Sequence, residues 1–405
     1  MSRQGVAFLI ACACVTLVSS VSAQEEAPPK EEPPPPAKEE APPKEEVTAP
    51  LKVTPMGYIE VYYAYNFRRP GNGITNYRGF DNRHNTFTLS NAALGALFEA
   101  GPVGGKIMLQ IGSTPSTYYS AEPNLAGAGG ANASTPEMWK YLQEAYVTYK
   151  APLGRGVLFQ AGLVASPIGM EQFAVKDHWT WSRSNLFFGL PYYHTGVRAT
   201  YEWSPEWTTT VSVFNGWNSV VDNNSEKSIQ TNTTYHVGDD FSINALYFGG
   251  VERNDNSPEG PWWRHVFDVV AQVQATSFLT TAAQADYGFE PNRIGTARWW
   301  AVAAAARFHV LKPLYFALRG DRFTEHLATD ATRSSAPIFW GGAEWVTEGT
   351  ATLDYRPHDQ ISIRLEGRHD IAEQPLYFGH QLTLPASRPN ARTQTTALIG
   401  VTAWF

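Results

Sequence analysis

Apolar and polar residues alternate along most of the chain beyond residue 55. In residues 57–67, Ile59 and Val61 fall on one face of a predicted strand, and Glu60 and Asn66 fall on the other. A period of two with a charged second face is typical of a β-strand between lipid and water. The pattern predicts about sixteen strands, near residues 56–68, 85–100, 105–112, 138–150, 156–163, 192–203, 207–217, 227–237, 241–251, 262–274, 278–290, 296–309, 313–325, 341–356, 361–370 and 392–405.

Several strands carry charges on one face only. In residues 361–370, Ile363 and Leu365 alternate with Arg364, Glu366 and Arg368. Because each Arg or Lys at the midplane of a bilayer costs about 2 to 4 kcal/mol, this face must point into an aqueous interior. The charges predicted to line that interior are Glu60, Lys106, Glu144, Arg198, Glu202, Asp268, Asp286, Arg319, Asp321, Glu348, Arg364, Glu366, Arg368 and Asp370.

The predicted strands are joined alternately by short turns and by mostly longer connections. All the short turns fall at the end where the chain also stops, on Trp404 and Phe405. The longest apolar run after residue 23, residues 299–306, is far below the roughly 20 residues that a spanning helix needs. The sequence therefore predicts an all-β fold, a transmembrane antiparallel up-and-down β-barrel, with the short turns in the periplasm.

The N-terminus predicts two further segments. Residues 1–23 combine Arg3, an apolar stretch and the small-residue sequence Val21-Ser22-Ala23, which is typical of a secretory signal peptide. A lipoprotein signal ending at Cys12 is the alternative. Both cysteines, Cys12 and Cys14, lie in this segment, so no disulfide or cysteine-ligated metal is expected in the mature chain.

Residues 24–54 are rich in Pro, Glu and Lys and contain a degenerate repeat at residues 25–46, and residues 55–405 are the predicted barrel. The repeat has too few apolar residues for a core, which predicts a disordered, extended periplasmic tether. The tether is interpreted as a solvated spacer or as a contact with the cell wall or a partner. It contributes eight Glu against four Lys to the formal charge of −7, so the barrel is nearly balanced and shows no basic excess for nucleic acid.

Short motifs along the barrel resemble the OmpL-like family of β-barrel porins. They are the opening strand of residues 57–63, Gly162 followed by residues 167–171, Ser182-Arg183-Ser184, residues 194–197, Asn215-Gly216-Trp217 with residues 222–224, residues 366–370 and the terminal Phe405. The tether departs from the family pattern, so the resemblance implies no role for it. The resemblance implies an outer-membrane pore for small solutes and does not specify the substrate.

The long connection at residues 165–191 contains Glu171, Lys176, Asp177 and Arg183. Sixteen-stranded barrels enclose a wide channel. We hypothesise that this third long loop folds inward and constricts the lumen, with Glu171, Asp177 and Arg183 setting a transverse field. The alternative is a loop packed on the outside. The inward strand charges could likewise line an open path or pair in a plugged lumen.

No motif for catalysis, nucleotide binding or a metal is found in the sequence, so we expect no enzymatic activity, no cofactor and no metal site. The sequence predicts a porin in the outer membrane of a Gram-negative bacterium, with lipid around it and ions or small hydrophilic solutes passing through. The alternative is a structural barrel whose tether links the membrane to the cell wall with little conductance. A homotrimer is suggested only by analogy with other sixteen-stranded porins.

Overall fold

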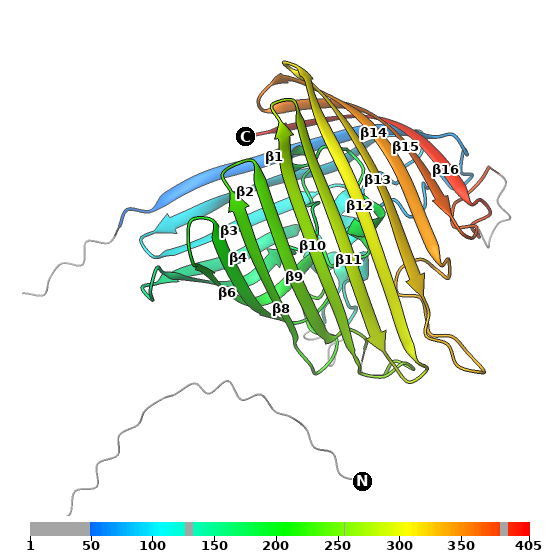
Figure 1. Ribbon diagram of the computed structural model, residues 1–405, viewed down its shortest axis with the longest axis horizontal. Coiled ribbons are helices and arrows are strands. Elements are labelled where there is room, and N and C mark those ends of the chain that lie inside the picture. The colour runs from blue at the N-terminus through cyan, green and yellow to red at the C-terminus, as the bar shows by residue number, and fades with distance from the viewer. Residues whose placement is uncertain (1–48, 126–132, 255, 381–387) are drawn as a thin grey trace, which may run out of the picture. The chain divides into compact units, whose positions relative to one another are not determined.

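The computed structural model describes residues 49–125, 133–254, 256–380 and 388–405. In this part of the chain the strands form one closed sheet, in which each strand is antiparallel to its neighbours and β1 pairs with β16 (Figure 1). The predicted sixteen-stranded antiparallel barrel is confirmed. The strands are β1 Lys52–Asn66, β2 Thr86–Ala100, β3 Val103–Ile111, β4 Leu142–Ala151, β5 Val157–Ala165, β6 Tyr193–Glu202, β7 Trp207–Phe214, β8 Ser228–Val237, β9 Phe241–Val251, β10 Trp263–Thr276, β11 Leu279–Pro291, β12 Thr296–Leu311, β13 Leu314–His326, β14 Trp345–His358, β15 Ile361–Ala372 and β16 Thr393–Trp404.

The predicted strands differ from the observed ones mainly at their ends. β1 begins at Lys52, before the predicted barrel boundary at residue 55, because Lys52 already pairs with Glu99 of β2. β7 ends at Phe214 rather than near 217, since Gly216 and Asn218 adopt positive φ values of 150° and 52°. The predicted signal peptide, and the predicted tether up to residue 48, lie outside the described residues.

Burial alternates along the strands in the phase that the sequence predicts. In β15, Arg364, Glu366 and Arg368 are buried, whereas Leu365 between them is 57 % exposed. Because the sheet is closed, the buried face is the barrel interior and the exposed face is the one that meets lipid. The charged face of this strand therefore points inward.

The faces of β12 could not be assigned from its alanine-rich sequence. In the structure Trp299 and Ala301 are buried, and Trp300 and Val302 are exposed. The position of Trp299 depends on its neighbour in β11, because a Cβ at Gly288 would lie 2.1 Å from the Trp299 ring. A glycine across the strand pair thus makes room for an inward tryptophan.

The connections divide by barrel end as the sequence predicts. At one end lie short turns, residues 101–102, 152–156, 203–206, 238–240, 277–278, 312–313 and 359–360. At the other end lie the connections that we call L1 to L8: L1 67–85, L2 112–141, L3 166–192, L4 215–227, L5 252–262, L6 292–295, L7 327–344 and L8 373–392. Only L6 is as short as the turns of the opposite end.

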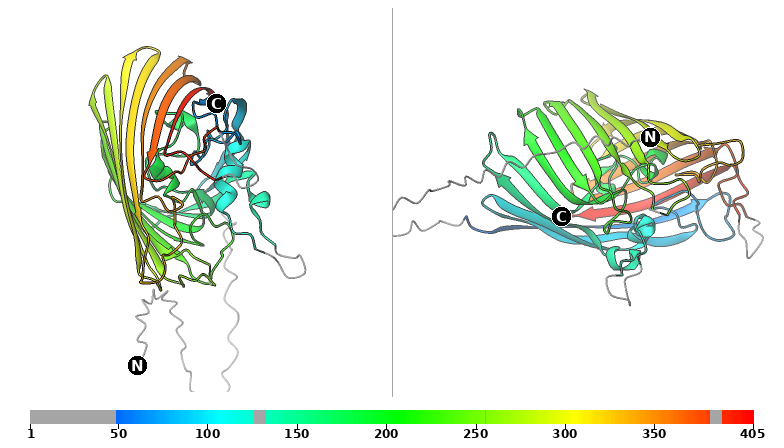
Figure 2. Two further views of the ribbon diagram at one scale, coloured as in Figure 1. Left: turned by 90° about the vertical axis from the view of Figure 1, so that its right-hand side faces the viewer. Right: turned by 90° about the horizontal axis from the view of Figure 1, so that it is seen from below.

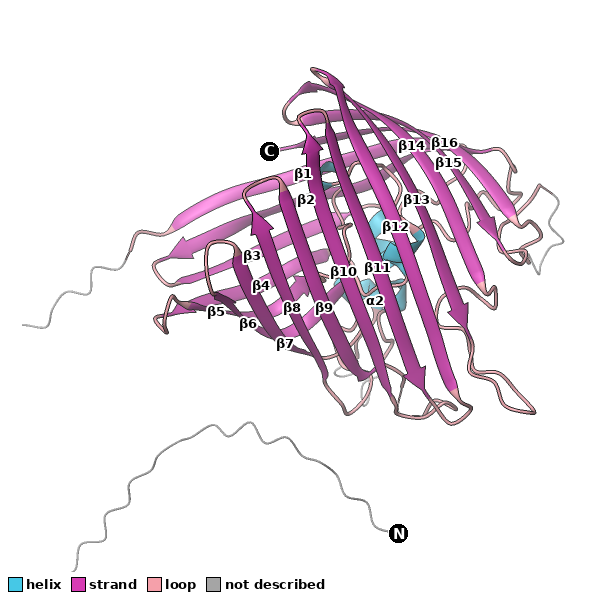
Figure 3. Ribbon diagram, viewed as in Figure 1, coloured by secondary structure: helices cyan, strands magenta, loops and turns pink. Residues whose placement is uncertain are grey.

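The described helices are short and lie in these loops (Figure 3). They are α1 Ser113–Tyr118, η1 Tyr119–Ala121, α2 Pro136–Trp139, η3 Val175–Asp177 and α3 Asn185–Phe188. In the ranges that the structure covers, none has the length and hydropathy that crossing a bilayer demands.

The wall of the barrel has unequal height. Strands β10 to β14 have 13 to 16 residues, whereas β3 to β8 have 8 to 10. A transmembrane strand needs about 9 to 11 residues. The taller side therefore extends beyond the thickness of the hydrocarbon, and the lower side barely matches it.

The interior at the loop end is packed with apolar side chains. Ile168, Leu186 and Leu190 of L3 join one cluster with Trp299 and Phe323 of the wall. A second cluster joins L1, L2 and L3 to β6, through Phe80, Tyr118, Tyr119, Phe173, Phe187 and Tyr193. The loops thus form a core inside the barrel, which stabilises them there through buried apolar area.

The assignment of faces makes a prediction about stability. Leu365→Arg places a charge toward lipid, and we expect it to lower the free energy of unfolding by about 2 to 4 kcal/mol. Denaturant titration of the protein folded in lipid vesicles measures this loss. Gln272→Arg is the control, because Gln272 faces inward, is exposed and lies equally far from its short turn. Equal losses in both variants would contradict the assigned faces.

Candidate functional site

L3 folds into the barrel and is held there by inward side chains of five strands, β1, β10, β11, β13 and β15. Its short helix α3 and the residues before it lie within the ring of strands, as Figure 2 shows in its left view. The hypothesis that the third loop folds inward rather than outward agrees with these contacts.

The strongest anchor is β15. The Arg364 guanidinium donates hydrogen bonds to the backbone carbonyl oxygens of Val175 and Thr180, both at 2.9 Å, and of His178 at 2.7 Å. The Glu366 carboxylate accepts hydrogen bonds from the backbone N–H groups of Trp181 at 2.5 Å and of Ser182 at 3.0 Å. One strand thus satisfies both donors and acceptors of an irregular segment.

β13 provides a second anchor. Arg319 donates to Glu171 at 2.7 Å and to the Ser182 carbonyl oxygen at 2.6 Å, and it pairs with Glu348 of β14 at 2.8 Å. Asp321 accepts from the backbone and the side-chain amide of Asn185, at 2.6 and 2.8 Å. These bonds fix the start of α3 against the wall.

The remaining anchors lie on other walls of the barrel. Glu60 of β1 accepts from the Val175 N–H at 2.6 Å, and Gln284 of β11 accepts from the Met170 N–H at 3.0 Å. The Gly169 N–H donates to Asp268 of β10 at 3.3 Å. L3 therefore spans the lumen between strands that are far apart around the barrel.

Local sequence explains how L3 makes these contacts. Gly169 has a φ of 84°, and a Cβ there would lie 2.8 Å from Leu190 and 3.1 Å from Gln284. The Ser184 side chain caps α3 by accepting from the Phe187 N–H. Gly169, which has no side chain, thus allows L3 to lie close to Gln284 of the wall. The Ser184 cap stabilises the start of α3.

Two of the predicted constriction residues, Glu171 and Arg183, form hydrogen bonds within L3 itself. Arg183 donates to the carbonyl oxygens of Gln172, Trp181 and Phe173, and Glu171 accepts from Ser184 besides its ion pair with Arg319. Both side chains are buried, Glu171 in an ion pair with Arg319 and Arg183 among backbone carbonyl oxygens, so neither faces open water. The transverse field stays a prediction.

Lys176 and Asp177 are the predicted loop residues that still face water. Their side chains pair at 2.7 Å and are 30 % and 52 % exposed. Beside them His178 is buried, and its Nε2 lies 2.7 Å from the Gln172 carbonyl oxygen. Burial, together with the neighbouring charges of Arg183 and Arg364, lowers the pKa of His178 well below its usual value, so the ring is neutral.

The predicted inward charges differ in their exposure. Glu60, Asp268, Asp286, Arg319, Asp321, Glu348, Arg364, Glu366, Arg368 and Asp370 are buried. Lys106 and Glu144 are partly buried and pair with each other, and Arg198, also partly buried, donates to Gln160. Glu202 is exposed at the end of β6. Ten of the fourteen charges are therefore covered by other groups rather than facing open water.

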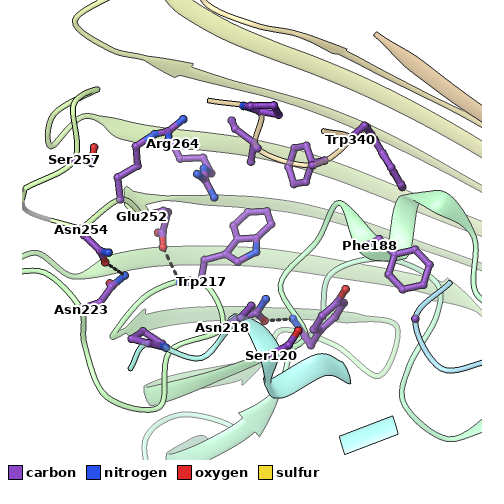
Figure 4. Close-up of a pocket in the computed structure, with 18 of the residues that line it drawn as sticks. Ser120, Phe188, Trp217, Asn218, Asn223, Glu252, Asn254, Ser257, Arg264 and Trp340 are labelled. Carbon is purple, nitrogen blue, oxygen red and sulfur yellow. Dashed lines mark hydrogen bonds between the residues drawn. The ribbon is translucent and has the colours of Figure 1, made fainter. Parts of the chain in front are cut away.

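Above L3, the loops enclose a second feature that the sequence did not predict. A cavity of about 990 Å³ lies between L1, L2, L3, L4, L5 and L7, and we call it the vestibule (Figure 4). Trp217, Tyr192 and Phe339 line it, together with Asn218 and Asn254. The sequence feature that could have indicated this cavity is the presence of aromatic residues in the long loops, because solvent-exposed segments are usually polar.

Comparison with known proteins places these features in a family. The family model described as "Putative beta-barrel porin-2, OmpL-like" matches residues 52–405. No curated protein matches the sequence.

Solved structures share the fold at low sequence identity. The outer-membrane channel DcaP of Acinetobacter baumannii is 14 % identical, with a TM-score of 0.56, over 88 % of this chain and 97 % of that one. An anion-selective porin from Comamonas acidovorans is 11 % identical, with a TM-score of 0.56, over 88 % and 100 %. A trimer form of OmpT from Vibrio cholerae is 9 % identical, with a TM-score of 0.54, over 88 % and 99 %. At these identities the likeness is one of fold.

The anchoring of L3 can be tested by proteolysis. Arg364→Met removes three hydrogen bonds to loop carbonyls while keeping the volume of the side chain, so we expect L3 to detach and trypsin to cleave after Lys176. Mass spectrometry of the folded protein detects the cut. Arg356→Met is the matched control, because Arg356 pairs with Asp354 of its own strand, β14, and makes no hydrogen bond or ion pair to L3. Resistance of both variants would refute the anchor.

Proposed function

This chain belongs to the OmpL-like β-barrel porin family, and we propose that it lets ions and small hydrophilic solutes diffuse passively across the outer membrane. The observation that carries the proposal is the position of L3, anchored across the lumen by polar and charged side chains of five strands. A loop in this place narrows a sixteen-stranded channel that would otherwise be wide.

Water-exposed inward side chains support an open path beside the loop. On β10, Gln272 and Gln274 share the inward phase of the buried Asp268, yet both are exposed. Gln272 borders a small cavity together with Asp177 and Trp179 of L3, and Gln274 lies two residues nearer the short turns. A polar, hydrated wall at this level is what a hydrophilic solute needs in order to leave the constriction.

Two ion pairs inside the barrel bear on the kind of solute. Lys176 pairs with Asp177, and Lys106 pairs with Glu144. Adjacent opposite charges largely cancel at a distance, so the channel lacks a ring of one sign among these residues. This arrangement supports passage of polar and neutral solutes without strong selection by charge.

The proposal predicts the effect of removing the constriction. A variant that lacks residues 171–183 loses the part of L3 that is anchored to β1 and β15, and we expect its single-channel conductance in a planar bilayer to rise above that of the intact protein. The control replaces residues 331–334, which are exposed in L7, with Gly and Ser. If the deletion leaves conductance unchanged, L3 does not narrow the channel; if the intact protein does not conduct at all, the porin function itself is rejected.

We further propose that the long loops face the outside of the cell and that residues 24–54 lie in the periplasm. Short turns at the end where β1 starts support this orientation, because outer-membrane barrels have short periplasmic turns. Trimer assembly stays a prediction for this chain.

Cysteine labelling tests the orientation, because both natural cysteines fall in the predicted signal peptide. Thr332→Cys in L7 should react with a membrane-impermeant maleimide in intact cells. Asp359→Cys, in a short turn, should react only after the outer membrane is permeabilised. Both positions are exposed in the structure, so accessibility alone does not separate them. The reverse labelling pattern would invert the proposed orientation.

A further inference from the structure

The vestibule has the size of a small-molecule site. Its volume of about 990 Å³ lies at the upper end of the range of about 300 to 1,000 Å³ that is usual for ligand pockets. Six loops and the start of β10 contribute to its lining. Phe188 and Tyr192 of L3 belong to this lining, so a solute in the cavity lies next to L3.

Aromatic rings from three different loops are available on its wall. Trp217 of L4, Tyr192 of L3 and Phe339 of L7 line the cavity and are only half-buried. Arg264 lies over the Trp217 ring at 5.1 Å, and the Phe248 ring meets Trp217 edge-on at 5.7 Å. These contacts hold the indole in place while part of it stays uncovered (Figure 4).

Uncharged polar groups stand around the rings. Asn218, Asn223, Asn254, Ser120 and Ser257 line the same cavity. The Asn223 amide donates to the Asn254 side-chain oxygen at 2.7 Å, which places two amides side by side at the rim. Each amide carries both donors and acceptors, so the wall can bond a ligand with many hydroxyl groups.

The arginines of the lining already have acidic partners. Arg264 pairs with Glu290 at 2.8 Å, and Arg253 pairs with Glu290 and with Glu259. Arg78 pairs with Asp81 and with Asp370. Arg78 Nε and Arg253 Nη2 make no hydrogen bond, but each of the two guanidinium groups is already paired with two carboxylates, so a carboxylate or phosphate that entered the cavity would compete with these acidic groups.

The one carboxylate in the lining is also engaged. Glu252 accepts from the Trp217 N–H at 2.6 Å and from the Ser228 hydroxyl at 2.5 Å. Burial raises the pKa of its carboxyl to about 7, and hydrogen bonds from Trp217 and Ser228 already occupy its two oxygens. An ionic ligand would therefore lose its hydration in the vestibule without gaining a free counter-charge.

We propose that the vestibule binds a short neutral saccharide, whose ring faces stack on Trp217, Tyr192 or Phe339 while its hydroxyl groups bond the amides. A sugar ring presents weakly positive C–H groups to the negative face of an aromatic ring, and its edge carries donors and acceptors. The inference rests on the proposed channel function only in that the bound sugar would be the solute delivered to L3.

Calorimetric titration of the purified full chain in detergent with maltotriose tests the site. We expect saturable binding, and Trp217→Ala should weaken it by about tenfold or more, since about 1.4 kcal/mol corresponds to a factor of ten. Phe339→Ala, a second ring in the lining, should also weaken it. Trp262→Ala is the matched control, because Trp262 is 49 % exposed in L5 and does not line the cavity. Heat-dependent mobility in gel electrophoresis confirms that each variant is folded.

Succinate is the charged probe, and we expect it not to bind. Binding of succinate as tight as that of maltotriose overturns the neutral class of ligand. Absence of maltotriose binding at roughly tens of millimolar, or binding unaffected by both ring variants, overturns the site. Conductance measured without sugar tests the channel function separately from the saccharide site. Current without maltotriose binding rejects the saccharide site alone, and maltotriose binding without current rejects the channel function alone.

Discussion

The structure depends on mutual satisfaction between buried strand charges and the irregular backbone of L3. In hydrocarbon every backbone N–H and C=O must find a partner, and irregular backbone is tolerated at membrane depth only when protein surrounds it. Arg364 donates hydrogen bonds to three carbonyl oxygens of the loop, and Glu366 accepts hydrogen bonds from two of its N–H groups. The same bonds remove the cost of burying those charges, which would be about 3 to 5 kcal/mol for a charge left without its partner.

This reciprocity explains why the interior is both charged and tightly packed. The apolar cluster of Ile168, Leu186 and Leu190 with Trp299 and Phe323 stabilises the packed loop through buried apolar area, and this contribution is not directional. The hydrogen bonds of the charged side chains determine where the loop backbone lies. Arg319 joins the loop to the wall, since it pairs with Glu171 of L3 and with Glu348 of β14. L3 is therefore held as a structural element of the barrel rather than as a surface loop.

The sequence was sufficient to predict the strands and to assign most of their faces to lipid or to the interior. Both predictions depend only on neighbouring residues, through the alternation of apolar and polar positions and the cost of a charge in lipid. It was insufficient for β12, where the inward position of Trp299 depends on Gly288 in the partner strand. It placed Glu171 and Arg183 in the correct loop, but their partners lie elsewhere along the chain or in the loop's own backbone. The vestibule could not be foreseen, since its wall combines residues from six loops whose separations only the closed barrel determines.

The unequal height of the wall affects the surrounding lipid. Beside β7, with 8 residues, acyl chains must shorten to keep the apolar band covered, whereas beside β12, with 16 residues, they need not. The elastic cost of this thinning is concentrated on one side of the molecule. Any protein that covers β3 to β8 would relieve that deformation, so the membrane itself favours neighbours on the low side over neighbours on the tall side.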